Sequence, residues 1–397
     1  MSAIEIPELV VAFVPEQVNV PFTLASELGF FRDEGIKVIP RVVPEGTGKM
    51  LSLLESGEVD LAVTVTDGFI AGRASGRNVQ LHGTYVKSPL VWAIAAAGAS
   101  EQVDLESLKA TLGGNKLRIG ISRIGSGSYT MGIYAASLIG LQTSDVEFVV
   151  ANNLLGLKEG VNAGDFDVFL WESFTTKPSF DRGEVKRIGA VATPWPSFSF
   201  VGRGAERSKD QELEENKPGA GGSLTGADAD VGAVAVPKWH ANAEDIKTRF
   251  FPALQRAVAL FMGQPNKSSA RIVKDFGHKA EDADLWLSRV QYNCVDGQVQ
   301  DDKQASKDKE AEKDYINSNS NFGLSQSHYS TSVDILKSVG LVPEDFSVCT
   351  LWADSTIATL LDEKDDDNKD VIGEDENKNK GVNKNNAKSA IGTEIES

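Results

Sequence analysis

Cysteine and histidine are scarce in this sequence. Its 397 residues include two cysteines, Cys294 and Cys349, and four histidines. Two cysteines so far apart exclude a disulfide framework and a cysteine-rich metal site. The histidines are scattered, and none has the HExxH spacing of a zinc protease. The sequence therefore predicts no bound metal and no cofactor.

Long apolar runs and an excess of basic residues are also missing. No stretch of about 18 uncharged apolar residues is present, so we expect no membrane insertion. The formal net charge is −17, from 40 basic and 57 acidic residues. Nucleic-acid binding requires a basic surface to neutralise phosphates, so we exclude it. Residues 1–8 lack the basic region of a secretory signal, and we expect a cytoplasmic protein.

The sequence from residue 9 to about residue 200 is typical of an α/β fold. Short apolar runs alternate there with segments of helical period. We expect strands at 9–14, 37–43, 60–63, 79–83, 90–94, 117–121, 146–150 and 167–171. Beyond residue 231, helical spacing predicts helices at 243–262, 268–276, 281–291, 328–339 and 352–361. Two polar segments, 204–231 and 298–321, are predicted to be flexible insertions. Residues 362–397 are predicted to form a disordered acidic Asn/Lys-rich tail.

A weak internal repeat suggests two similar lobes. Residues 55–63 and 162–170 each contain a helix end, a glycine and an aspartate that enters an apolar strand. Each follows a glycine-rich helix start, at 46–48 in the first half and at 125–128 in the second. Two α/β lobes with a groove between them account for this pattern, and chance similarity of two helix-to-strand turns is the alternative.

The two glycine-rich helix starts are candidate binding sites for an anionic or carbonyl group. Neither Gly46-Thr47-Gly48-Lys49 nor the segment around Gly125 has the complete spacing of a phosphate loop or a dinucleotide fingerprint. Free N–H groups and the positive end of a helix dipole nevertheless favour an anion. The alternative is that these small residues only cap their helices.

Acidic residues follow three expected strands at the edge where open α/β sheets bind ligands. Asp67 and Glu172 occupy equivalent strand ends, and Glu16 follows the first strand. A carboxylate at such a position can bind an amine or a ring N–H, and helix capping is the alternative. No nucleophile elbow of the form Gly-x-Ser-x-Gly is present. His82 is the only histidine expected near the groove, and a structural role is its alternative.

Three segments resemble a known superfamily. They are residues 13–16 (FVPE), 21–38 (PFTLASELGFFRDEGIKV) and 53–62 (LLESGEVDLA). They are similar to type II periplasmic-binding-protein-like solute receptors, in the group of nitrate, sulfonate and taurine substrate-binding proteins and fungal thiamine pyrimidine-precursor synthases. The resemblance is strongest to fungal intracellular members of unassigned substrate, and it covers residues 9–200 well and 231–361 loosely.

The resemblance implies a two-lobed α/β fold with a cleft and two crossover strands. Residues 8–89 would begin lobe 1, 90–196 would form lobe 2, and 197–361 would return to lobe 1. The crossovers would lie near residues 88–90 and 196–198. The ligand-binding positions expected from the resemblance and from the sequence are Glu16, Gly46, Thr47, Gly48, Thr66, Asp67, Trp92, Ser122, Arg123, Ser126, Gly127, Ser128, Asn152, Asn153, Trp171 and Glu172.

The leading functional hypothesis is an intracellular solute-binding protein that is not an enzyme. Its ligand would be small and polar, with an anionic group at Arg123 or a pyrimidine-like ring against Trp171 or Trp92. An enzyme of thiamine or pyrimidine-precursor metabolism, with Lys49 or His82 as the reactive group, is one alternative. The precursor synthases carry a cysteine-rich iron cluster, which two cysteines do not provide. The other alternative is a scaffold protein that has a vestigial cleft and binds a partner through its tail.

Overall fold

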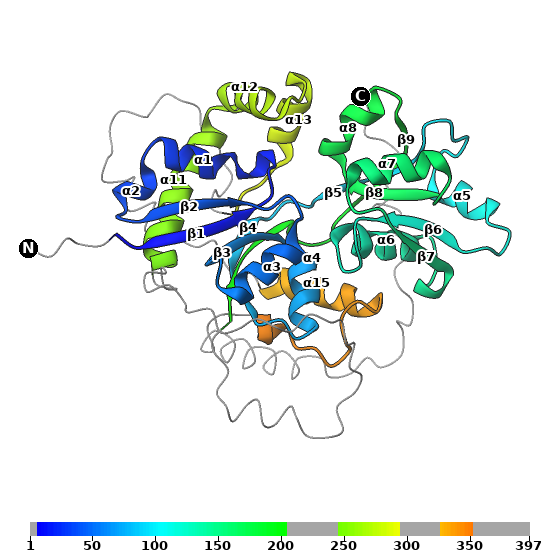
Figure 1. The fold of residues 1–397 in the computed structure, drawn as a ribbon, viewed down its shortest axis with the longest axis horizontal. Helices are drawn as coiled ribbons and strands as arrows, with labels where there is room; N and C mark the ends of the chain where they lie inside the picture. Colours follow the sequence, from blue (N-terminus) through cyan, green and yellow to red (C-terminus); the bar gives the residue numbers. More distant parts are fainter. Residues whose placement is uncertain (1–5, 205–244, 294–325, 352–397) are drawn as a thin grey trace, which may run out of the picture.

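The computed structural model describes residues 6–204, 245–293 and 326–351, which form two lobes (Figure 1). The expected insertions apart from Gly204, the expected helix at 352–361 and the tail lie outside the described residues. No helix in the described part is long and apolar enough to cross a membrane. The expected two-lobed α/β fold is confirmed.

Lobe 1 is built on a mixed five-stranded sheet. In spatial order its strands are β2 (Lys37–Val42), β1 (Glu8–Phe13), β3 (Leu61–Val65), β10 (Phe198–Arg203) and β4 (Val79–Val86). The first three strands are parallel, and β10 runs antiparallel to both of its neighbours. Its helices are α1 (Val20–Glu27), α2 (Phe30–Asp33), α3 (Thr47–Ser56), α4 (Thr66–Ala74), α11 (Phe251–Gly263), α12 (Pro265–Phe276), α13 (Ala280–Arg289) and α15 (Gln326–Ser338).

Lobe 2 repeats this topology. In spatial order its strands are β7 (Val146–Val150), β6 (Leu117–Ile121), β8 (Val168–Glu172), β5 (Val91–Ala97) and β9 (Val185–Ala192). Here β5 is the antiparallel strand between β8 and β9. Its helices are α5 (Leu105–Thr111), α6 (Gly127–Leu138), α7 (Leu154–Ala163) and α8 (Ser173–Asp181). Each sheet therefore receives one strand, β5 or β10, directly after the chain crosses from the other lobe.

Two short crossover segments connect the lobes, residues 87–90 and 193–197. They run side by side, because the Thr193 N–H donates to the Leu90 carbonyl at 2.9 Å and the Ser197 N–H donates to the Ser88 carbonyl at 3.3 Å. The segment after α13 joins them, since the Lys87 N–H donates to the Gln291 carbonyl at 2.8 Å. The lobes are thus linked by hydrogen-bonded backbone at one side of the cleft.

Helices cover both faces of the lobe 1 sheet (Figure 1). On one face, α1, α2 and α11 pack around an aromatic cluster that includes Phe22, Phe31, Phe200 and Phe250. On the other face, α3, α4 and α15 bury residues such as Met50, and this core continues into lobe 2. The lobes therefore share apolar contact as well as the crossover segments.

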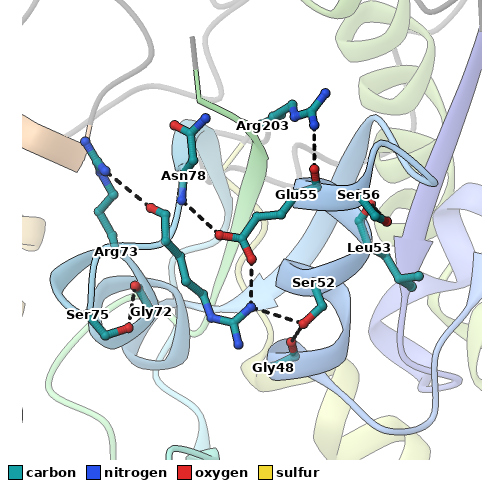
Figure 2. Close-up of polar contacts among 11 residues, drawn as sticks. Gly48, Ser52, Leu53, Glu55, Ser56, Gly72, Arg73, Ser75, Asn78 and Arg203 are labelled. Atoms are coloured by element: carbon teal, nitrogen blue, oxygen red, sulfur yellow. Dashed lines mark hydrogen bonds and ion pairs between the residues drawn. The ribbon is translucent and has the colours of Figure 1, made fainter. Parts of the chain in front are cut away.

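A polar network fastens α3 to the rest of lobe 1 (Figure 2). The Glu55 carboxylate accepts hydrogen bonds from the Arg77 guanidinium and the Asn78 N–H, both at 3.0 Å. Arg77 also donates to the Ser52 hydroxyl at 3.1 Å, and Arg203 on β10 donates to the Glu55 carbonyl. These contacts fix α3 beside α4 and the sheet, and with it the helix start at the cleft.

The expected internal repeat is present at the turns that lead into β3 and β8. Gly57 and Gly164 each end a helix with a left-handed φ, 75° and 80°, a conformation that glycine adopts without steric cost. Asp60 and Asp167 then each accept a hydrogen bond from a backbone N–H of β1 or β6, at 2.7 and 2.9 Å. The two turns therefore have the same structural role.

The expected equivalence of the two glycine-rich helix starts is wrong. Helix α3, which begins after Gly46, follows β2, the second strand of lobe 1, whereas α6, which is capped by Ser126, follows β6, the first strand of lobe 2. The counterpart of α3 is α7, which follows β7. Small residues recur at these helix starts because capping requires them, whichever strand precedes the helix.

Most strands expected from the sequence are present, but several elements of the described residues were not expected, among them α8 and β9. No element was expected at α8 or β9, between residues 173 and 192. Helix α8 is mostly polar and contains Pro178, so it has no clear helical period. Helix α11 is also shorter than expected, because a π-helical turn (Ile246–Phe250) precedes it.

Candidate functional site

A cavity of about 340 Å³ lies between the two lobes, beside the crossover segments. We call it the interlobe cavity. From lobe 1 it is lined by residues 16–18 and by α13, and from lobe 2 by one side of α8 along its whole length and by Arg187 of β9. The crossover residues 88–90 and 197 close its base. Its volume suits a small organic molecule.

Glu16 enters the cavity from the end of β1. The short helical turn that follows (Gln17–Asn19) leads into α1. Two buried tyrosines hold this turn, because the Tyr85 and Tyr292 hydroxyls both donate to the Val18 carbonyl at 2.8 Å. The carboxyl group of Glu16 has no hydrogen-bond partner among the described residues. It is therefore positioned by a rigid backbone and available to a ligand.

Glu172 enters the cavity from the end of β8 in lobe 2. Its carboxylate caps α8, accepting the Phe174 N–H at 2.9 Å and the Thr175 N–H at 2.7 Å. The Thr175 hydroxyl adds a third hydrogen bond at 2.8 Å. Glu172 therefore caps a helix and also lines the cavity, which are the two roles considered for it from the sequence.

The two carboxyl groups face one cavity from opposite lobes. Burial raises the pKa of Glu16 to about 8, and the negative charge of Glu172 adds to this shift. Burial also raises the pKa of Glu172, whereas its hydrogen bonds to Phe174 and Thr175 lower it. The pair therefore binds a proton more tightly than separate carboxyl groups do. A ligand cation placed between them would replace that proton.

The remaining wall of the cavity is largely apolar. Phe174, Phe198, Trp286 and Leu90 line it. Phe174 also packs against the His278 ring at 4.0 Å between ring centres. Aromatic walls with a few polar groups favour a flat, partly apolar ligand.

Ion pairs join the lobes across the mouth of the cavity. Lys177 on α8 lies 3.3 Å from Asp282 on α13 and 2.9 Å from Asp181. Lys279, just before α13, lies 2.6 Å from Asp181 on α8. We call these four residues the interlobe ion-pair cluster. It holds α8 of lobe 2 against α13 of lobe 1 beside the cavity.

The predicted polar residues at the starts of α3 and α6 are mostly bonded within the protein. The Thr47 hydroxyl accepts the Val65 N–H at 3.2 Å. Ser128 interacts with the Ser126 hydroxyl at 2.9 Å and accepts the Ser122 N–H at 3.0 Å. These residues lie on the facing surfaces of the lobes but do not line the interlobe cavity, so their ligand role stays a prediction.

Arg123 extends from lobe 2 towards the start of α3. A Cβ atom on Gly48 would lie 3.2 Å from its guanidinium, and one on Gly46 would lie 3.7 Å away. Burial lowers the pKa of Arg123, and the charge of Arg77 acts in the same direction. Arg123, Gly46 and Gly48 therefore lie close together, outside the interlobe cavity.

Asp67, Trp92 and Gly127 lie where α4 meets lobe 2. Burial raises the pKa of Asp67 to about 6, and nearby N–H groups, Trp195 and Thr130 oppose this shift. A Cβ atom on Gly127 would lie 2.8 Å from the Trp92 ring. Trp92 is 7% exposed and is held inside the core rather than in the cavity.

Four further predicted residues have local roles. The Thr66 hydroxyl lies 2.8 Å from the Ser199 hydroxyl in the lobe 1 core. Asn153 caps α7 by accepting the Gly156 N–H at 3.0 Å, and the exposed Asn152 beside it has a φ of 68°. Trp171 packs in the core cluster of lobe 2.

Sequence reasoning missed several residues that line the cavity. They are Phe174, Lys177, Asp181, Arg187, Asp282, Trp286 and Arg289. Most lie on α8 and α13, two helices that are far apart in the chain. No periodicity or motif indicates that these helices meet. Only the amphipathic pattern at 281–291, which predicted a helix there, pointed to one of them.

The residues proposed for enzymatic alternatives lie elsewhere. Lys49 is exposed on α3, and His82 packs against Gly202 of the neighbouring strand β10. Neither lines the interlobe cavity. In the described ranges, no three His, Cys, Asp or Glu side chains form a group that could hold a metal ion.

Comparisons with known proteins agree with this architecture. The sequence profile of a family described as Ca3427-like PBP matches residues 92–191. The structure of the Candida albicans CA3427 gene product, described as defining a new family with the generic periplasmic binding protein fold, is 27% identical. That match covers 86% of this chain and 93% of the other, with a TM-score of 0.64. No match was found among curated proteins.

Two bacterial receptors share the fold at lower identity. The periplasmic aliphatic sulphonate binding protein SsuA of Escherichia coli is 14% identical over 87% of this chain and 92% of its own, with a TM-score of 0.53. The periplasmic nitrate-binding protein NrtA of Synechocystis PCC 6803 is 12% identical over 93% and 90%, with a TM-score of 0.54. The chain thus has a periplasmic-binding-protein-like fold. It is similar to the Candida albicans CA3427 protein.

Proposed function

We propose that this protein binds a small solute with a basic nitrogen in the interlobe cavity. The observation that carries this proposal is the pair Glu16 and Glu172, which presents carboxyl groups from both lobes to one enclosed space. A protonated amine or a protonated ring nitrogen between them would contact both lobes. Such a ligand would favour the closed arrangement, because it binds the closed form better than the open one.

The proposal follows from the electrostatics of Glu16 and Glu172 when no ligand is bound. Without a cation, Glu16 retains a proton up to a pH of about 8. When a ligand cation binds near neutral pH, Glu16 loses that proton and forms a charge-assisted hydrogen bond. Binding should therefore release a proton and should strengthen as the pH rises from 6 to 8, while the ligand stays protonated.

Titration calorimetry with benzylamine tests this proposal. Measurement at pH 7 in buffers of different ionisation enthalpy gives both the affinity and the number of protons released. We expect Glu16→Gln to weaken benzylamine binding about tenfold, the value of one charged hydrogen bond, and to abolish proton release. Benzyl alcohol, which lacks the charge, should bind wild type and variant equally.

The control is Glu101→Gln, because Glu101 is exposed on lobe 2 and lies outside the cavity. It should bind benzylamine as the wild type does. Equal benzylamine affinity for wild type and Glu16→Gln, or no binding at millimolar concentration, would contradict the proposal.

A further inference from the structure

Two arginines enter the interlobe cavity from opposite lobes. Arg187 lies on β9 in lobe 2, and Arg289 is the last residue of α13 in lobe 1. Neither guanidinium has an ion-pair partner in the described part of the chain, and Arg187 makes one long hydrogen bond, 3.4 Å, to the Gly189 carbonyl. Burial lowers the pKa of Arg187, and the positive charge of Arg289 lowers it further.

The other charges of the cavity do not neutralise these arginines. In the interlobe ion-pair cluster, Lys177 and Lys279 balance Asp181 and Asp282. Glu172 caps α8 through three hydrogen bonds and belongs, with Glu16, to the proposed amine site. The two exposed guanidinium groups therefore repel each other, with no ion-pair partner among the described residues to offset the repulsion. An anion between them would remove this repulsion.

Arg187 is separated from Glu172 by one intervening strand and by three residues along the strands. Strand β5 lies between β8, which carries Glu172, and β9, which carries Arg187. Since neighbouring strands are about 4.8 Å apart, β8 and β9 lie about 10 Å apart. The cavity thus presents acidic groups and basic groups at separate positions, with Phe174 and Leu90 also in its wall.

We infer that Arg187 and Arg289 form an anion-binding subsite of the interlobe cavity, and that the ligand carries a sulfonate, phosphate or carboxylate in addition to its basic nitrogen. The inference rests on the proposed function, because it assigns the second group of the same ligand. The two arginines belong to different lobes, so the anion bridges them. Both ends of such a ligand would then hold the lobes together.

Inorganic sulfate tests the subsite without the amine site. We expect sulfate, added at constant ionic strength, to raise the melting temperature of the wild type. Arg187→Gln and Arg289→Gln should each lower the sulfate affinity at least tenfold. Arg41→Gln, which changes an exposed arginine on β2, should respond as the wild type does. Arg289 is exposed at a helix end, so its replacement tests the subsite even if Arg187→Gln folds poorly.

Three matched probes test whether both subsites serve one ligand. 4-(Aminomethyl)benzenesulfonate carries an amine and a sulfonate at opposite ends of a ring, and benzylamine and toluenesulfonate each carry one of them. The first should bind the wild type at least tenfold more tightly than either of the others. Arg289→Gln should abolish this advantage.

The outcomes separate this inference from the proposed function. If sulfate stabilises the wild type and both arginine variants equally, or if the sulfonate adds no affinity to benzylamine, the subsite is wrong while the amine site stands. If Glu16→Gln leaves benzylamine affinity unchanged but the arginine variants lose sulfate, the proposed function fails and the anion subsite stands.

Discussion

Glu16 is uncharged near neutral pH because its surroundings are poorly solvated and already contain an acid. The backbone cannot move it towards solvent, since Tyr85 and Tyr292 both donate to the Val18 carbonyl two residues later. Ionisation of the Glu16 carboxyl group in this position lowers the free energy of unfolding. Carboxyl groups with a strongly raised pKa are found mainly at functional sites. The rigid turn therefore holds Glu16 in a position from which it can bind a ligand.

The pH dependence of stability should show this cost. The pKa of Glu16 rises from an ordinary 4.5 to about 8 in the folded protein. The folded state then binds more protons than the unfolded state between these values, so this contribution to the free energy of unfolding falls as the pH rises from 4.5 to 8. Glu16→Gln should remove that fall, about 4 kcal/mol, in urea titrations at pH 5 and pH 8.5. An unchanged pH profile would contradict the assigned pKa.

A second residue-scale prediction concerns Gly120 on β6. A Cβ atom there would overlap the ring of Phe166, which is 2% exposed and also packs against Gly160. Gly120→Ala should lower the free energy of unfolding by about 2 kcal/mol, the usual cost of overpacking a core. Gly263→Ala is the matched control, because no atom lies within 4 Å of its added methyl group. Equal melting temperatures of the two variants would refute this account.

At the scale of elements, α8 and α13 form the contact between the lobes beside the cavity. They belong to different lobes and meet through Phe174 and Trp286, whose ring centres are 6.2 Å apart, and through the interlobe ion-pair cluster. Exposed ion pairs stabilise little, but the Asp282 side chain is only 6% exposed. Loss of its partner Lys177 would leave a buried carboxylate poorly compensated.

Lys177→Met should therefore lower the free energy of unfolding by about 1–2 kcal/mol in urea titrations. The double variant Lys177→Met, Asp282→Asn should recover most of that loss, because no unpaired charge remains. Arg182→Gln breaks an exposed ion pair with Glu184 on lobe 2 and should change stability by less than about 0.5 kcal/mol. A double variant no more stable than Lys177→Met would show that the pair contributes nothing.

At the scale of the whole molecule, two lobes are linked by two adjacent crossover segments at one side of the cleft. We expect residues 87–90 and 193–197 to act as a hinge that lets one lobe rotate against the other. A hinge of this kind closes when a ligand contacts both lobes. The carboxyl pair and the arginine pair each span the lobes, so a ligand that binds both pairs should favour closure.

Spin labels on the two lobes would measure this closure. Exposed positions are Glu58 in lobe 1 and Ser144 in lobe 2, each changed to cysteine after Cys294 and Cys349 are replaced by alanine. We expect 4-(aminomethyl)benzenesulfonate to shift the interlobe distance distribution to shorter values, measured by double electron–electron resonance. Labels at Arg41 and Glu58, both in lobe 1, should show no shift. Identical interlobe distributions with and without the probe would exclude ligand-driven closure.

Much of the fold follows from local patterns that act over short stretches of chain. Apolar strands and capped helices predicted the α/β class, and the glycine and aspartate of each repeat predicted equivalent turns at Gly57 and Gly164. Glu16 and Glu172 were predicted as cleft residues because the ends of parallel strands gather at one edge of a sheet. Each of these patterns involves residues close together in the chain, so a single sequence is enough to detect it.

The tertiary structure alone decided which of the sixteen candidate residues share the cavity. Hydroxyl groups such as those of Thr47 and Ser128 found partners inside the protein, which no local pattern indicates. Arg187 and Arg289 came together through the docking of α13 on lobe 1 and the crossover of the chain into lobe 2. Local chain geometry determines strands, turns and caps, whereas the meeting of distant side chains depends on how the lobes pack.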